Sequence, residues 1–322
     1  MSETQNNQLP DDPNWQKDVL TKLLFASLEE QKRTRKWNTI FKVLLLIYLL
    51  LVLMAMLIPG GAKSPLPKGD HTALIEINGV IASDAEASAD NVVTGLRKAF
   101  ENDDVKGIIL RINSPGGSPV QAGYINDEIK RLREKYKDTK VYAVIADLCA
   151  SGGYYIASAA DEIYADKGSL VGSIGVVING FGFVDAMGKL GVERRLYTAG
   201  ENKGFLDPFS PQKHDETKHV QGMLGQIHQQ FIDVVKAGRG DKLKDDPTLF
   251  SGLVWTGEEG MRLGLVDALG SSSYVAREVI KAEDIVDYTT KPTILEQLVD
   301  RFSVKVASTL ANTMLQNNLN LQ

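Results

Sequence analysis

The sequence is poor in the residues that build disulfides and metal sites. It has one cysteine, Cys149, which excludes an intramolecular disulfide and a zinc site made of cysteines. The four histidines form no HExxH pattern, which disfavours a zinc peptidase, and we expect neither a metal ion nor a cofactor. Basic residues are not in excess: 36 Lys and Arg stand against 41 Asp and Glu. The resulting net charge of −5 argues against nucleic-acid binding.

Charge is almost absent from one stretch, Ile40 to Ile58, in a chain of otherwise ordinary globular composition. As a helix its 19 residues span about 28 Å, close to the roughly 30 Å of a bilayer core. Its one charge, Lys42, lies near the end, where the ammonium can reach the interface. A buried core helix and a cleaved signal peptide are the alternatives. About forty residues precede the run, which is too many for a signal peptide, so residues 40–58 are interpreted as a retained transmembrane helix.

The distribution of basic residues predicts the orientation of this helix. Five of them precede or begin the run, and two follow it closely: Lys32, Arg33, Arg35, Lys36 and Lys42, against Lys63 and Lys68. The positive-inside rule then keeps residues 1–39 in the cytoplasm and places the larger part of the chain on the exported side.

The composition divides the chain into five segments. Residues 1–39 begin with a polar, disordered stretch and continue, over 15–31, with the apolar spacing of an amphipathic helix. The transmembrane helix at 40–58 is followed by a Gly/Pro-rich linker at 59–70. The main domain covers residues 71–292. Residues 293–322 are predicted to form a C-terminal helix and tail.

The main domain alternates apolar strands with helices, which predicts an α/β fold with a largely parallel sheet. Strands are expected at 72–81, 105–112, 140–148, 162–165, 169–178 and 192–198. Helices are expected at 91–102, 119–137, from 152 onwards and at 212–238, and the stretch 255–270 is expected to be a helix with turns.

Three loops carry residues capable of chemistry. The loop 113–118, Asn-Ser-Pro-Gly-Gly-Ser, lies between a strand and a helix, where its glycines can expose N–H groups to a ligand or simply form a tight turn. Ser151 stands at the next strand-to-helix junction, which suits a nucleophile but also an ordinary helix N-cap. Cys149 is interpreted as a buried strand residue. Lys203 is a solvated loop charge unless the fold buries its amine beside a serine, where the neutral form could accept the hydroxyl proton.

Several motifs, in order along the chain, resemble the signal peptide peptidase A family. They are INSPGGS at 112–118, DLCASGGYYIAS at 147–158, GSIGVV at 172–177, GENKGFLDPFSP at 200–211 and WTGEEGMRLGLVDALG at 255–270. The family consists of membrane-anchored serine proteases related in fold to the Clp protease proteolytic subunit and to crotonases. The resemblance covers about residues 72–290 and fits the short, single-repeat form. It implies a fold of repeated ββα units and makes residues 71–292 a peptidase domain.

The resemblance also implies a role for each site residue. Ser151 is the nucleophile, Lys203 is the general base, and Ser173 positions Lys203. The N–H groups of Gly152 and of Gly116 or Gly117 form the oxyanion hole. The serine and lysine of one site come from neighbouring copies of a homo-oligomeric ring. The remaining candidates, His214, His219 and His228, are assigned to solvated surface.

The expected function is cleavage of remnant signal peptides, or of other short hydrophobic peptides, by a peptidase anchored in the bacterial cytoplasmic membrane. The peptidase domain is expected on the periplasmic side. A broader quality-control protease of unfolded exported proteins, an inactive membrane-anchored scaffold and an acyl-CoA enzyme are the alternatives. A catalytic serine and lysine disfavour a scaffold, and export away from coenzyme A disfavours the acyl-CoA enzyme.

Overall fold

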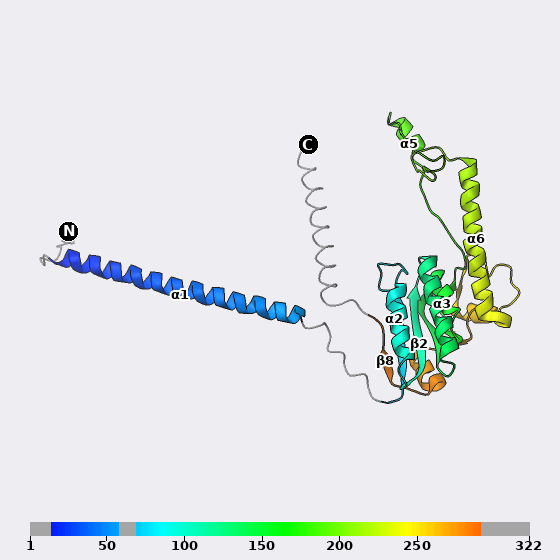
Figure 1. The fold of residues 1–322 in the computed structure, drawn as a ribbon, viewed down its shortest axis with the longest axis horizontal. Helices are drawn as coiled ribbons and strands as arrows, with labels where there is room; N and C mark the ends of the chain where they lie inside the picture. Colours follow the sequence, from blue (N-terminus) through cyan, green and yellow to red (C-terminus); the bar gives the residue numbers. More distant parts are fainter. Residues whose placement is uncertain (1–13, 58–68, 291–322) are drawn as a thin grey trace, which may run out of the picture. The chain divides into compact units, whose positions relative to one another are not determined.

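The computed structural model describes residues 14–57 and 69–290 (Figure 1). The chain divides into two compact units, one of which contains helix α1 (Trp15–Leu57), while the other spans residues 65–292. The predicted disorder of residues 1–13, most of the predicted linker and the predicted C-terminal helix lie outside the described residues.

Helix α1 is unbroken, although two separate helices, over 15–31 and 40–58, were expected. The residues that join them, 32–39, include neither proline nor glycine, so nothing interrupts the backbone hydrogen bonds. In the described part of the chain it is the one helix long and apolar enough to cross a membrane. Leu44, Leu46 and Leu50 are exposed, as in a helix that packs against lipid.

The second unit is built on a mostly parallel sheet, which confirms the predicted α/β class. The central strands are β1 (His71–Asn78), β2 (Val105–Ser114) and β3 (Lys140–Ala150), each parallel to its neighbour. The sheet continues past β1 to β8 (Ile285–Asp287) and past β3 to β5 (Leu170–Gly172) and β6 (Val254–Thr256). Among the strand pairs of residues 69–290, only β5–β6 is antiparallel.

The outer edge of β3 pairs with two strands in succession. Its first half, Tyr142–Ile145, pairs with β4 (Glu162–Ala165), which in turn pairs with β7 (Ala268–Leu269). Its last residues, 148–150, pair with β5. The carboxyl ends of β3 and β5 therefore lie next to each other at one edge of the sheet.

Helices cover both faces of the sheet. Alternate residues of β1, β2 and β3, such as Ile75, Leu110 and Ala143, are buried on the face covered by α2 (Ala89–Phe100) and α3 (Pro119–Lys135) (Figure 1). The other alternate residues, such as Ile109 and Val144, pack with Val275 of the helical turn Val275–Ile280. This alternation follows from the two-residue period of a strand.

The remaining helices are α4 (Gly152–Ala157), α5 (Val184–Lys189), α6 (His214–Arg239), α7 (Gly257–Leu263) and α8 (Ser272–Tyr274). The last half of α6 packs against α4, where the Phe231 and Tyr155 rings lie 5.2 Å apart. Residues 179–213 and the first turns of α6 extend away from the sheet (Figure 1). We call residues 179–220 the arm.

Three expectations about the second half of the domain were wrong. The strand expected at 169–178 ends at Gly172, because Gly172 and Ser173 have φ of 104° and 51° and turn the backbone out of the sheet. The strand expected at 192–198 is irregular, since this part of the arm lies beyond the sheet and has no neighbouring strand to pair with. The stretch 255–270 contains two short strands besides the helix α7.

Candidate active site

Ser151 occupies a sharp corner between β3 and α4. Its φ of 51° is in the left-handed region, which is costly for any residue with a Cβ. Two backbone hydrogen bonds hold this conformation: the Ser151 N–H donates to the Gly172 carbonyl at 2.9 Å, and the Tyr155 N–H donates to the Ser151 carbonyl at 2.9 Å. The corner therefore presents a fixed, half-buried hydroxyl beside the N-terminus of α4.

Ser173 occupies the equivalent position on the neighbouring strand. Ala150 and Gly172 are paired in the parallel ladder, so the two serines follow paired residues on strands about 4.8 Å apart. Ser173 also has a φ of 51°, and its N–H donates to the Leu253 carbonyl at 2.7 Å. Both serines line the same cavity.

The glycine loop between β2 and α3 runs directly against the Ser151 corner. A Cβ on Gly116 would lie 2.7 Å from the Ser151 Cβ, and a Cβ on Gly152 would lie 3.3 Å from the Gly117 nitrogen. The Gly116 N–H donates to the Ser114 hydroxyl at 3.1 Å. Only residues without a Cβ allow the two backbones to approach this closely.

The loop is fastened on its other side to Ile81. The Ile81 N–H donates to the Gly116 carbonyl at 2.9 Å, and the Ser118 N–H donates to the Ile81 carbonyl at 2.8 Å. Because the N–H and C=O of a trans peptide point in opposite directions, the Gly117 N–H points away from Ile81. The Gly117 N–H is therefore not bonded to Ile81 and lies on the side of the loop that faces Gly152.

The cavity over the two serines has a volume of about 570 Å³. Its walls come from the glycine loop, the start of α3, α4, the segment after Ser173 and the last half of α6. Most of the lining side chains are apolar or absent: Pro115, Gly117, Pro119, Ala122, Gly152, Tyr155, Gly175, Val176, Val177, Ile227, Phe231 and Gly252, with Ser151, Ser173, Gln230 and Ser251. Such a cavity suits an extended chain carrying small or apolar side chains.

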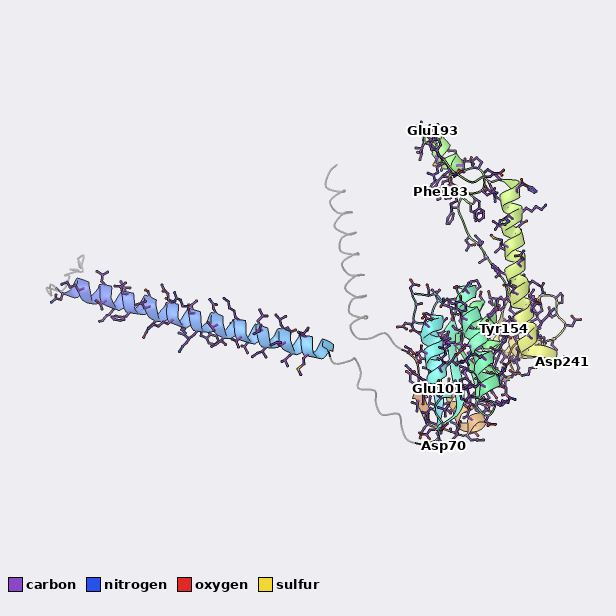
Figure 2. All side chains as sticks on the ribbon, viewed as in Figure 1. Asp70, Glu101, Tyr154, Phe183, Glu193 and Asp241 are labelled. Atoms are coloured by element: carbon purple, nitrogen blue, oxygen red, sulfur yellow. The ribbon has the colours of Figure 1, made fainter. Side chains whose placement is uncertain are left out.

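Lys203 is not brought to Ser151 within the single chain. It is exposed on the arm and is not among the residues that line the cavity. Its neighbour Phe205 packs edge-on against His219 at 6.2 Å between ring centroids. The α6 residues that reach the cavity, Ile227 and Phe231, follow His219 by about 12–18 Å along the helix axis. Figure 2 shows Phe183 of the arm well away from Tyr154 of α4.

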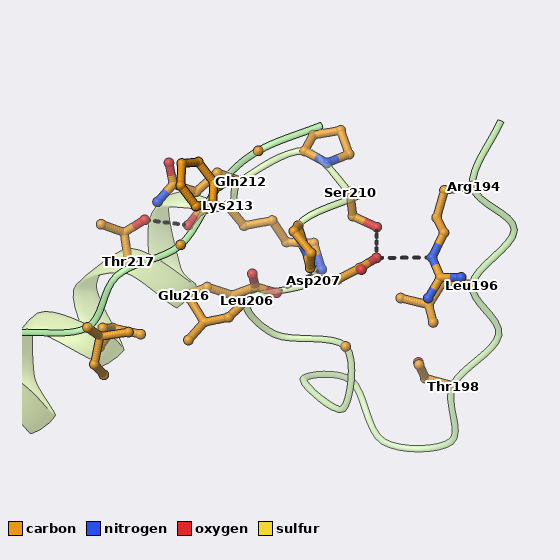
Figure 3. Close-up of a pocket in the computed structure, with 18 of the residues that line it drawn as sticks. Arg194, Leu196, Thr198, Leu206, Asp207, Ser210, Gln212, Lys213, Glu216 and Thr217 are labelled. Atoms are coloured by element: carbon orange, nitrogen blue, oxygen red, sulfur yellow. Dashed lines mark hydrogen bonds and ion pairs between the residues drawn. The ribbon is translucent and has the colours of Figure 1, made fainter. Parts of the chain in front are cut away.

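The arm has a cavity of its own, of about 810 Å³ (Figure 3). On one side of it Asp207 accepts hydrogen bonds from the Ser210 hydroxyl at 2.6 Å and from Arg194 Nε at 3.3 Å. The Ser210 hydroxyl, the Phe209 N–H and the Arg194 guanidinium hold the pKa of Asp207 below its usual range. Large apolar side chains on the arm are exposed: Phe181 by 81%, Leu190 by 78% and Tyr197 by 88%.

The expectations for Cys149 and for two of the three histidines are confirmed. Cys149 is fully buried in β3, and burial raises the pKa of its thiol, so the unreactive thiol form is favoured. His214 and His219 are exposed on α6. Across the described residues, no three His, Cys, Asp or Glu side chains are grouped to hold a metal ion.

The expectation for His228 was wrong. Its ring is half-buried, and Nε2 lies 3.1 Å from the carbonyl oxygen of Ile174, the residue after Ser173. The sequence contains a signal for this position. His228 follows Leu224 by four residues and precedes Phe231 by three, so it lies on the apolar face of α6.

Comparison with known proteins places the chain among peptidases. The model of Peptidase family S49 matches residues 133–286. The chain is 31% identical over 223 residues to a putative signal peptide peptidase SppA of Enterococcus faecium, covering 67% of this chain and 64% of that protein. It is 33% identical over 199 residues to the putative protease slr0021 of Synechocystis, covering 62% of this chain and 69% of that protein.

A further match is to a protein of a different name. The chain is 50% identical over 175 residues to a Na(+)/H(+) antiporter NhaA of Brucella melitensis. The match covers 54% of this chain but 24% of the antiporter. The chain thus spans about a quarter of that relative and about two thirds of the Enterococcus and Synechocystis proteins.

Proposed function

Because the chain belongs to peptidase family S49, we propose that it is a serine endopeptidase with Ser151 as its nucleophile. The observation that carries this proposal is the strained corner at Ser151, which faces an apolar cavity beside a loop of close-packed glycines. A hydroxyl fixed at a strand-to-helix corner can attack a peptide carbonyl held against the α4 N-terminus.

The N–H groups of Gly152 and Gly117 are proposed to stabilise the charged oxygen of the tetrahedral intermediate. Gly152 is the first residue of α4, where backbone N–H groups lack intrahelical partners. Of the two loop glycines, Gly117 is the better donor, since the Gly116 N–H is occupied by the Ser114 hydroxyl. The Gly117 nitrogen lies close to Gly152, which supports the proposal that both N–H groups donate to the same oxygen.

Substitution of Gly117 by alanine is expected to lower kcat by about 10²–10³-fold, the usual cost of losing one oxyanion donor. A Cβ at this position would collide with the Ile81 carbonyl and push the loop out of place. Gly123→Ala on α3 is the matched control, because a Cβ there meets no atom within 4 Å. Peptide hydrolysis and thermal unfolding of both variants test the assignment. A folded Gly117→Ala enzyme with the wild-type kcat contradicts it.

Lys203 is proposed to act as general base at the Ser151 of a neighbouring copy. In a single chain the amine is too far along the arm to reach Ser151, so each site needs a second subunit. The exposed apolar side chains of the arm support such a contact, because soluble surfaces seldom expose so much apolar area without a partner. Ser173, which lines the same cavity as Ser151, is proposed to orient the incoming amine. The resulting assembly is a homo-oligomeric ring.

The substrates are proposed to be remnant signal peptides or other short hydrophobic peptides near the membrane. The apolar walls of the cavity suit the apolar cores of such peptides. The length and composition of α1 support anchoring in the bacterial cytoplasmic membrane. Basic residues 32–36 support an orientation with residues 1–39 in the cytoplasm and the peptidase domain on the periplasmic side.

The alternative is a quality-control protease that degrades unfolded exported proteins. Digestion of a synthetic signal peptide and of denatured casein by the full-length protein in lipid nanodiscs separates the two. We expect kcat/KM to be at least about tenfold higher for the signal peptide than for casein. This ratio corresponds to transition-state binding that is about 1.4 kcal/mol stronger. Equal values favour the quality-control role. An assembled protein that cleaves neither substrate overturns the proposal of an enzyme and favours a scaffold.

A further inference from the structure

His228 contacts the segment that follows Ser173. Its Nε2 lies 3.1 Å from the Ile174 carbonyl oxygen, and because a carbonyl can only accept, Nε2 carries the proton of this hydrogen bond. The contact joins the middle of α6 to the wall of the Ser151 cavity. Ile227 and Phe231, the neighbours of His228 on α6, line the same cavity.

The segment held in this way is anchored by the fully buried side chain of Ile174, but its backbone pairs with no strand in the described part of the chain. The β5 ladder ends at Gly172, and the described residues 173–178 belong to no strand. At its start Ser173 is kept in a left-handed conformation by the bond from its N–H to Leu253. Further along, Val177 and Ile178 are exposed. The buried side chain holds Ile174 in the core, and the His228 hydrogen bond in addition fixes the direction of its carbonyl, one residue beyond the strained serine.

Attachment of α6 to the body does not depend on His228. Phe231 is 5% exposed and packs on Tyr155, and Val235, one turn further, is fully buried. These apolar contacts hold the last half of α6 against α4. The hydrogen bond of His228 therefore stabilises the segment that it contacts and is not needed to hold α6 against the body.

We propose that His228 is a positioning residue that fixes the Ile174 carbonyl and thereby the Ser173 hydroxyl. The consequence for catalysis rests on the proposed function, because Ser173 matters to the reaction only if it orients the Lys203 amine. Loss of the contact leaves the cavity walls made by the glycine loop, α4 and α6 in place, but lets the Ser173 hydroxyl and the adjoining wall at 175–177 shift. The effect therefore falls more on the chemical step than on substrate binding.

Kinetics of His228→Ala and His228→Gln test the proposal. Glutamine keeps an N–H donor at nearly the same reach as Nε2, whereas alanine removes it. We expect His228→Ala to lower kcat by about 10–100-fold, as misplaced catalytic groups do, with KM changed less than about threefold. We expect His228→Gln to restore most of the loss. The control is Gln229→Ala, which removes an exposed hydrogen bond to Asp233 on the same helix and should leave kcat unchanged.

Hydrogen exchange of residues 170–178 gives a second readout that does not depend on activity. It is measured by mass spectrometry on the full-length protein carrying Ser151→Ala, so that no copy digests another. Exchange should be faster when His228→Ala is added and unchanged when His228→Gln is added. This comparison stands even if the wild-type protein cleaves no peptide, an outcome that refutes the proposed function alone.

Any one of three outcomes overturns the positioning role. The first is an unchanged exchange rate over residues 170–178 in the alanine variant. The second is a kcat that does not fall in that variant, or that falls equally in the alanine and glutamine variants. The third is a fall in kcat accompanied by a tenfold rise in KM and loss of the oligomer, which assigns His228 to the fold of α6 instead.

Discussion

Replacement of Ser151 by alanine should abolish peptide hydrolysis, with kcat lowered by on the order of 10⁴–10⁶-fold. The loss is this large because the Ser151 hydroxyl is the group proposed to form the covalent acyl intermediate, while the oxyanion donors and the cavity retain only a small residual rate. The fold should be preserved, since alanine keeps the backbone bonds of Ser151 to Gly172 and Tyr155. Single-turnover hydrolysis of a fluorogenic apolar peptide measures the effect.

The matched control for this variant is Ser271→Ala. Ser271 caps α8, accepts a hydrogen bond from the Tyr274 N–H and does not line the Ser151 cavity. Its loss should cost about 1 kcal/mol of stability and leave kcat unchanged. Retention of more than a few per cent of hydrolysis by Ser151→Ala would remove Ser151 from the mechanism.

Replacement of Lys203 by alanine should lower kcat by about 10⁴-fold, and the double variant with Ser151→Ala should be no slower than Ser151→Ala alone. The two groups are proposed to act as one unit, in which case their losses do not add. Lys189→Ala, which removes another exposed arm lysine, is the control for a general change of charge. An equal loss in both lysine variants would assign the effect to the arm as a whole.

Mixed assemblies of Ser151→Ala and Lys203→Ala subunits test whether each site is shared. Random mixing of equal amounts pairs an intact serine with a neighbour's intact lysine at roughly a quarter of the interfaces of a ring. About that share of the wild-type rate should therefore return. The two variants carry different tags and are co-expressed, so that purification over both tags selects mixed assemblies. Inactive mixed assemblies of the correct mass would contradict a shared site.

The regular part of the domain could be predicted from the sequence. The strands at 71–78, 105–114 and 140–150 are buried on both faces and appear as apolar runs, and the helices between them have clear endings. The motifs around Gly116 and Ser151 follow such strands, whereas Ser173 was expected inside a strand and follows the shorter β5. The three motifs lie near one another because β2, β3 and β5 are paired in parallel. The predicted resemblance to signal peptide peptidase A is confirmed by the family match.

The arm could not be predicted in the same way. Residues 192–198 were expected to form a strand, but a strand needs a partner, and the local sequence does not show that the chain has left the sheet there. The same applies to 173–178, where the backbone turn at Gly172 and Ser173 ends the ladder. His228 was missed because a histidine on a long helix is usually exposed. Its contact with Ile174 depends on how α6 crosses the cavity.

The position of Lys203 on the arm, outside the Ser151 cavity, has a consequence if the site is shared between copies as proposed. A newly inserted copy would then be inactive, because its own amine would not serve its own hydroxyl. Hydrolysis would begin only after several copies find one another in the bilayer. The protein would then stay inactive without a removable pro-segment. Proteolysis would begin only where the local concentration of subunits in the bilayer is high enough for assembly.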